Sequence, residues 1–370
     1  MIYLVCFAAS VFFAHLAYRV KKGGVFLFFS VLSILTTVML AGLRDYSIGT
    51  DVENYMTLRQ FWDGAINSKS LGDYLRLYFS MNLTEPLFAL FIGMIAQFVG
   101  DYRLFLLLSH LVIVTAIYVG AFRMKHHARP ELVLLLFYLL YYNNSLNIIR
   151  QYMAMAVVFA FLVELENRRF GRYIMAVLIA MLIHNTAIIS FVPLIIYLVL
   201  YPKKETVAPP AVRMFWICGV ILVGVYFFIP LVNLAIRWGV LNSKFDYYFQ
   251  DETSKLAITR LLIRILEVVG LLICYQKIRR KNQYLEFYVV NTVTFLALLE
   301  MSRSIAHGQR IPVHFAFSNI VTVSMMESCH KKSNVRLVWA AMIISLSAYY
   351  WFHTYVLGGA SETIPYQFGI

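Results

Sequence analysis

The chain has 370 residues, of which 61% are hydrophobic and only 14% are charged. Because a soluble domain has about 25% charged residues, this composition and a mean hydropathy of +0.72 exclude an ordinary soluble protein and indicate a polytopic membrane protein. The 32 Lys and Arg exceed the 19 Asp and Glu and give a formal net charge of +13. In a membrane protein such an excess is typical of cytoplasmic loops, so it does not imply nucleic acid as a partner.

Apolar runs extend from the first residues to Phe352 without a long hydrophilic block, which predicts one all-α integral membrane domain over residues 1–370. The first run lacks a basic start and a small-residue cleavage site, so we expect a retained span and not a signal peptide. A helix needs about 20 apolar residues to cross the bilayer core. The candidate spans are residues 2–19, 25–43, 85–100, 102–122, 131–146, 148–165, 172–184, 186–201, 214–236, 258–276, 284–301, 312–328 and 336–353.

Short loops rich in Lys and Arg are predicted to be cytoplasmic. Two complete spans between residues 85 and 122 would place the basic loop at Arg123 on the opposite side from the basic loop at Arg19. We therefore expect the short segment 85–100 to be re-entrant or interfacial, which leaves about 12 transmembrane helices. The two longest loops, at 44–84 and 237–257, then face the non-cytoplasmic side.

The stretch from Arg44 to Tyr55 interrupts the apolar sequence with one arginine, three acids and two tyrosines directly after a predicted span. Gly49 and Thr50 are expected to break the helix, so that a loop holds Arg44 and Asp51 at a helix end. Polar residues concentrated at membrane depth usually mark a site. Interfacial loops also carry mixed charges for anchoring, which is the alternative interpretation.

Several arginines lie at predicted helix ends on the non-cytoplasmic side, without a matching set of acids. They would repel one another unless an anion joined them, and the planar guanidinium suits phosphate oxygens. The alternative for each is extension to the interface or pairing with Asp45, Glu85 or Glu267. The candidates are Arg44, Arg150, Arg303 and Arg310, and Arg260 and Arg264 share one helix face because they are four residues apart.

Arg150 is the strongest of these candidates, because with Asn147 and Gln151 it forms a polar helix start inside an apolar run, where charge is costly. His184 lies between two apolar stretches, and a histidine can accept a proton from an alcohol. Lone histidines in helices are more often structural. Asp51 is the other candidate base, and it could instead orient an arginine.

No HExxH sequence occurs, and Cys329, which lies beside His330, Lys331 and Lys332, does not suggest a metal site, so neither a metal site nor a cofactor is predicted. The four cysteines also give no pair that suggests a disulfide.

Several short motifs follow one another over nearly the whole chain. They are Arg44 with Gly49-Thr50-Asp51 and Tyr55, Ile149-Arg150-Gln151 with Ala154, His184 with Ala187, and Ile364-Pro365-Tyr366. In this order they resemble the EpsG family, which is similar to Wzy-type polysaccharide polymerases. The resemblance implies a multi-pass, GT-C-type glycosyltransferase of the bacterial inner membrane that joins lipid-linked repeat units into O-antigen, capsule or exopolysaccharide.

The resemblance further implies undecaprenyl-diphosphate-linked oligosaccharides as substrates, membrane lipids as surroundings, a chain-length regulator as a candidate partner, and neither a metal nor a cofactor. In an inverting transfer, negative charge develops on the leaving diphosphate, and arginines would stabilise it as oxyanion-hole donors do. The roles expected are diphosphate contact for Arg44, Arg150, Arg303 and Arg310, base or orienting group for His184 or Asp51, and support for Tyr55, Gln151, Arg260, Arg264 and Tyr366.

Two alternative functions remain open. A flippase for lipid-linked sugars would gather arginines around a diphosphate but needs no base. An O-antigen ligase would use a different acceptor and tends to carry a large periplasmic loop with a histidine. The loop at 237–257 has no histidine, which favours the polymerase.

Overall fold

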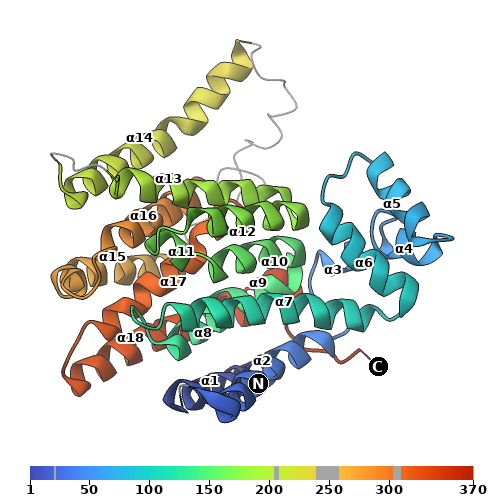
Figure 1. Cartoon of the computed structure of the whole chain (residues 1–370), viewed down its shortest axis with the longest axis horizontal. Coiled ribbons are helices and arrows are strands. Elements are labelled where there is room, and N and C mark those ends of the chain that lie inside the picture. Colours follow the sequence, from blue (N-terminus) through green and yellow to red (C-terminus); the bar gives the residue numbers. More distant parts are fainter. Residues whose placement is uncertain (21, 204–207, 239–257, 303–309, 370) are drawn as a thin grey trace. The chain divides into compact units, whose positions relative to one another are not determined.

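The computed structural model describes residues 1–20, 22–203, 208–238, 258–302 and 310–369. Over these residues the elements are helices joined by turns (Figure 1). The β interaction between Arg44 and Phe368 is an isolated bridge. The predicted all-α class is therefore confirmed for the described part of the chain.

Five helices in the described residues are long and apolar enough to cross a membrane, which supports a multi-pass membrane protein. They are α1 (Ile2–Val20), α2 (Gly23–Gly42), α7 (Tyr102–Arg123), the first part of α14 (Pro210–Arg237), and α18 (Ser333–Trp351) with the π-helical turn that follows it. Three shorter apolar helices cover Pro86–Phe98, Phe170–Ile183 and Asn185–Leu200. The count of about 12 spans stays a prediction, because several predicted spans are short or interrupted.

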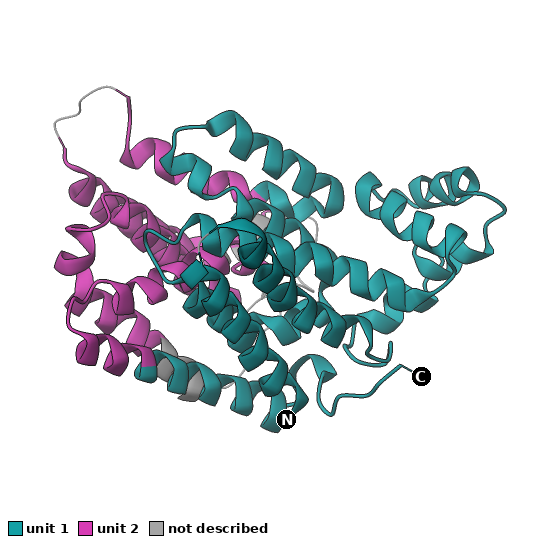
Figure 2. Cartoon of the chain, turned by 60° about the horizontal axis from the view of Figure 1, so that its bottom comes forward, with its two compact units in different colours: residues 1–188, 341–370 teal, residues 189–340 magenta. Residues whose placement is uncertain are grey.

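The chain divides into two compact units, residues 1–188 with 341–370 and residues 189–340 (Figure 2). In the first unit α7 packs against α2, α6, α8 and α10, and α10 also packs against α12. The remaining helices of this unit are α3 (Val52–Thr57), α4 (Trp62–Asn67), α5 (Leu71–Ser80), α6 (Pro86–Phe98), α8 (Pro130–Phe137), α9 (Asn143–Asn147), α10 (Ile149–Ala160), α11 (Val163–Glu166) and α12 (Phe170–Ile183).

The predicted loop at 44–84 contains the three short helices α3, α4 and α5. The helix α4 contacts α3, α5 and α6, so this stretch is packed and not extended (Figure 1). Its side chains Tyr74 and Tyr78 are buried, and Tyr74 donates a hydrogen bond to the carbonyl of Gln60 over 3.0 Å. Local aromatic packing therefore gives this stretch a structure that its mixed polarity did not suggest.

The segment predicted at 85–100 forms α6, which has 13 residues. At 1.5 Å per residue this helix is about 20 Å long, shorter than the roughly 30 Å of a hydrocarbon core. Its length agrees with a segment that does not cross the bilayer, and its position in a membrane stays a prediction.

Two predicted spans, 131–146 and 148–165, are interrupted. A π-helical turn at Tyr138–Tyr142 separates α8 from α9, and Ile148 separates α9 from α10. A second π-helical turn covers Phe352–Leu357, and Tyr355 in it donates a hydrogen bond to the carbonyl of Leu140 over 3.0 Å. Hydropathy did not predict these breaks, because π turns are held by such tertiary contacts and not by a change in polarity.

In the second unit α16 (Leu285–Met301) contacts α13 (Phe191–Leu200), α14, α15 (Ile258–Arg279) and α17 (Val313–Ser328). A buried carboxylate organises part of this unit. Glu267 accepts hydrogen bonds from Arg264 over 2.7 Å and from Asn319 over 3.0 Å, which connects α15 to α17.

The close contact of α7 with α10 yields a stability prediction. A Cβ on Gly120 would lie 2.5 Å from Cδ1 of Phe159 and 3.2 Å from its carbonyl oxygen. We expect Gly120→Val to lower the free energy of unfolding by about 1–3 kcal/mol through overpacking, measured by thermal unfolding of the purified protein in detergent. Gly219→Val in α14 is the control, because a Cβ there has no described atom within 4 Å; an equal loss in both variants would contradict the packing explanation.

Candidate functional site

A buried carboxylate, Glu85, lies at the centre of the polar residues of the first unit. It is the residue directly before α6, and Pro86 occupies the first turn of that helix. Proline is well tolerated there and disfavours helical geometry at the residue before it, so the local sequence ends the preceding loop at Glu85. The residue is only 5% exposed.

Three groups donate hydrogen bonds to Glu85. Nη1 of Arg150 forms an ion pair with Oε2. Nδ1 of His184 lies 2.6 Å from Oε1, and the backbone amide of Asn185 lies 3.1 Å from the same oxygen. The side chain of Asn185 also donates to Oγ1 of Thr84 over 2.6 Å, which closes the cluster. The carboxylate thus joins the start of α6, the start of α10 and the end of α12.

The charge distribution sets the protonation of this cluster. Burial alone would raise the pKa of Glu85, but the hydrogen bond from His184 and the charge of Arg150 outweigh burial and hold that pKa below its usual value. Because the carboxylate is ionised and only accepts, Nδ1 of His184 carries the proton that it donates. The lone pair of a neutral His184 therefore lies on Nε2, which makes Nε2 the atom able to accept a proton.

Aromatic rings surround the Arg150 guanidinium. Its central carbon lies 5.6, 4.8 and 5.4 Å from the ring centres of Tyr55, Phe61 and Phe88, which are cation–π distances. Nε of Arg150 is buried and has no hydrogen-bond partner among the described residues. The charged Arg150 guanidinium therefore has one N–H donor, at Nε, without a hydrogen-bond partner among the described residues.

The loop that follows α2 holds the helix break next to Arg150. Arg44 donates from Nη2 to the carbonyl of Leu146 over 2.7 Å, and the backbone amide of Asp51 donates to the side chain of Asn147. Gly49 has φ +102°, and a Cβ there would lie 3.2 Å from the carbonyl oxygen of Leu146. Glycine permits this φ and this close approach. The predicted helix break at Gly49 is therefore confirmed.

Arg44 is fully buried. Its Nε and Nη1 atoms have no hydrogen-bond partner among the described residues. Burial lowers the pKa of Arg44 to about 10, although the surrounding tyrosines act to raise it. The C-terminal segment covers this arginine. Tyr366 donates a hydrogen bond to the carbonyl of Leu40 over 2.8 Å, and the amide of Gly369 donates one to the carbonyl of Leu43 over 3.0 Å. In this structure Arg44 stabilises a chain junction, and its contact with a diphosphate stays a prediction.

The predicted site residues fall into separate groups. Arg150 and His184 contact Glu85, and Tyr55 contacts Arg150, whereas the backbone amide of Asp51 donates to Asn147. Two further residues of the first unit are involved in packing: Gln151 is buried and Tyr366 lies in the C-terminal segment.

In the second unit, Arg264 forms an ion pair with Glu267. Pairing with an acid was the alternative considered for the arginines, and the structure shows it for both Arg264 and Arg150. Arg310 is partly exposed, while Arg303 and the side chain of Arg260 lie outside the described residues, as do residues 239–257 of the loop predicted at 237–257. The meeting of these arginines with Arg150 stays a prediction.

Glu85 is the functional candidate that sequence reasoning considered only as a partner for an arginine. The available signal was its position, an acid at the start of an apolar run directly before a proline. A cavity of about 670 Å³ lies elsewhere in the first unit and is lined by residues of α1, α2 and α7, among them Tyr18, Ser30 and Arg123. None of its lining residues belongs to the Glu85 cluster, so the polar contacts, and not this cavity, locate the candidate site.

Comparison with protein families tests the resemblance. A family model described as the EpsG family matches residues 27–368. The chain belongs to the EpsG family. The predicted membership is confirmed, and for an EpsG chain with several apolar helices it implies a membrane protein of polysaccharide biosynthesis. A search of curated proteins and a search of solved structures each returned no match.

The Glu85 cluster predicts a specific dependence of stability on pH. Glu85→Gln leaves the Arg150 charge without its partner, so we expect the free energy of unfolding at pH 7 to fall by about 3–5 kcal/mol. Because the pKa of Glu85 is lowered in the folded protein, its contribution is complete above the ordinary value of 4.5 and is lost as pH falls below it.

Thermal unfolding in detergent at pH 7 and at pH 4 measures both effects. The difference between the variant and the original protein should shrink at pH 4. Glu53→Gln is the control, because Glu53 is an exposed acid in α3. A difference that stays constant with pH would show that the lost stability does not come from the ionised carboxylate.

Proposed function

We propose that this member of the EpsG family is a polysaccharide polymerase of the GT-C type. It joins undecaprenyl-diphosphate-linked repeat units by an inverting glycosyl transfer on the periplasmic face of the bacterial inner membrane. The observation that supports this proposal is the Glu85 carboxylate hydrogen-bonded to Nδ1 of His184, beside a cation with an unused donor.

The mechanism follows from the two ring nitrogens of His184. Nε2 accepts the proton of the acceptor sugar hydroxyl while that oxygen attacks the anomeric carbon of the donor. The bond between the anomeric carbon and the diphosphate oxygen breaks, and the lipid diphosphate leaves with the electron pair. Glu85 fixes the orientation of the imidazole and stabilises the imidazolium that forms, as the carboxylate does in a Ser-His-Asp triad.

Arg150 is assigned to the leaving diphosphate. Its guanidinium is paired with Glu85, but Nε has no hydrogen-bond partner among the described residues. A hydrogen bond from a charged donor to phosphate is stronger than one between neutral groups. Charge grows on the diphosphate during the transfer, so this contact strengthens toward the transition state. Asp51 remains the alternative base, because its backbone joins the same junction through Asn147.

A flippase is the rival function from another class. It would also bind a lipid diphosphate with Arg150, but it has no use for a histidine oriented by a carboxylate. Purified protein given lipid-linked repeat units in detergent separates the two: a polymerase produces a ladder of products, and a flippase leaves the units unchanged. A ligase would instead transfer the glycan to lipid A core.

The assignment of Arg150 predicts the phenotype of its removal. Arg150→Ala should abolish chain extension while membrane insertion persists, because the leaving diphosphate loses its cation; polymer length on gels and the amount of protein in membranes measure the two. Arg76→Ala is the control, since Arg76 is an exposed arginine of α5 paired with Asp73. Normal polymer length in the Arg150 variant would refute the assignment.

The role of His184 predicts a loss in turnover. His184→Ala should lower kcat by about 10²–10⁴-fold, the usual contribution of a general base, with a smaller change in KM.

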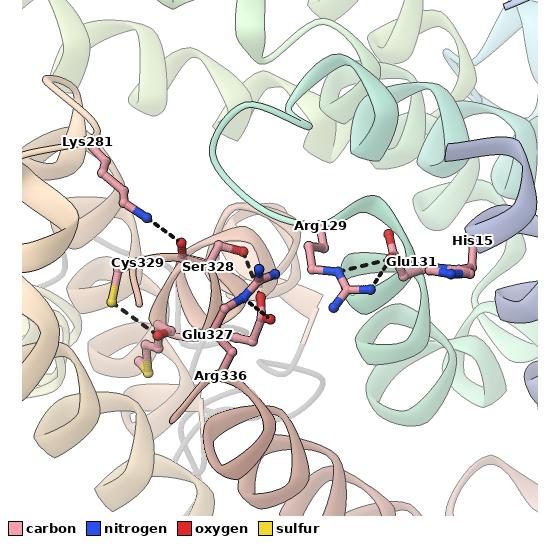
Figure 3. A network of polar contacts seen from close by, with 9 residues as sticks. His15, Arg129, Glu131, Lys281, Glu327, Ser328, Cys329 and Arg336 are labelled. Atoms are coloured by element: carbon pink, nitrogen blue, oxygen red, sulfur yellow. Dashed lines mark hydrogen bonds and ion pairs between the residues drawn. The ribbon is translucent and has the colours of Figure 1, made fainter. Parts of the chain in front are cut away.

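The chain supplies a matched control for that variant. His15 in α1 bonds Glu131 over 3.0 Å, and Arg129 bonds the same carboxylate (Figure 3). This group has the residue types of the Glu85 cluster but lies by a predicted cytoplasmic loop. His15→Ala should leave kcat unchanged, and equal losses in both variants would contradict the proposed base.

A further inference from the structure

A cluster of potential metal ligands lies in the second unit and contains none of the residues assigned to the transfer chemistry. Cys274 belongs to α15, Cys329 caps the end of α17, and His330 follows it. All three side chains are buried. One donor atom from each lies within 4.8 Å of the others, and Sγ of Cys274 lies 3.6 Å from Nε2 of His330.

The separation of sulfur and nitrogen fits a shared metal ion. A tetrahedral zinc ion has Zn–S bonds of about 2.3 Å and Zn–N bonds of about 2.0–2.1 Å, which place a sulfur and a nitrogen ligand about 3.6 Å apart. The Sγ atoms of Cys274 and Cys329 lie within 4.8 Å of each other, and Cys329 donates a hydrogen bond to the carbonyl of Met326 over 3.2 Å. Thiolate and imidazole together are the donors that select zinc or copper(I) over magnesium or calcium.

Surrounding contacts hold the ligands in place. The ring of His330 stacks on Trp339 with centroids 5.9 Å apart and planes inclined by 18°. Lys281 donates to the carbonyl of Ser328 over 2.8 Å, next to Cys329 (Figure 3). Glu327, two residues before Cys329, accepts a hydrogen bond from Arg336 over 2.9 Å. Fixed ligands of this kind favour a metal site, because little ordering remains to be done on binding.

We propose that Cys274, Cys329 and His330 bind one Zn²⁺ ion, with a small exogenous ligand such as water in the fourth position. Binding releases the two thiol protons, and the two thiolates neutralise the charge of the ion. The ion would join the end of α15 to the end of α17 and stabilise the second unit. This site differs from the sequence expectation of no metal, because Cys274 lies 56 residues from His330 and no short motif contains both.

The metal content of the full-length protein tests this site. Protein purified in detergent, supplied with Zn²⁺ and dialysed, should retain about one zinc per chain by mass spectrometry of the elements. Replacement by Co²⁺ should give the absorption of thiolate-to-cobalt charge transfer. Cys274→Ser and Cys329→Ser should each lose the zinc and this absorption. Cys6→Ser and Cys218→Ser are matched controls, since both are cysteines outside the cluster, and they should retain both signals.

A second measurement does not depend on the folding of the variants. In the original protein, zinc should slow alkylation of Cys274 and Cys329 relative to Cys218. The proposal is overturned if the original protein retains no zinc, if the control variants lose as much zinc as the cluster variants, or if peptide mapping of the native protein finds Cys274 and Cys329 joined as a disulfide.

Discussion

The first unit depends on one buried carboxylate. Glu85 binds an arginine 65 residues away and a histidine 99 residues away in sequence, so it fixes the starts of α6 and α10 against the end of α12. A buried charge is costly unless partners satisfy it, and here a cation, an imidazole and a backbone amide do so. The same contacts decide the protonation of His184. Stability and the proposed chemistry therefore depend on the same atoms.

The residues that resemble the family motifs lie around one junction in this unit. Arg44 donates a hydrogen bond to the carbonyl of Leu146, and the amide of Asp51 donates one to the side chain of Asn147. Leu146 and Asn147 are the last two residues of α9. The C-terminal segment returns to the same loop, where the bridge between Arg44 and Phe368 forms. Ile148 breaks the helix directly before Arg150, so the loop and the C-terminal segment together set the position of that side chain. This arrangement gives a structural reason for polar residues that are far apart in the sequence.

The sequence was sufficient for the features that depend on composition and local chemistry. Apolar runs predicted an all-α membrane protein, Gly49 predicted the loop that follows α2, and the cost of a charge within an apolar run identified Arg150 as a candidate. Features that depend on distant contacts were missed, namely the central position of Glu85, the π turns and the cysteine cluster. Residue type alone also does not identify the site, because Glu131 with His15 and Arg129 reproduces the composition of the Glu85 cluster.

A double-mutant cycle between Glu85 and Arg150 tests the central claim most directly. Unfolding of the original protein, Glu85→Gln, Arg150→Met and the double variant is compared in the same detergent. If the carboxylate and the guanidinium are partners, the double variant should lose less stability than the sum of the single variants, with a coupling energy of about 1–3 kcal/mol. Additive losses, with a coupling below about 0.5 kcal/mol, would show that the two residues act independently and would contradict the account.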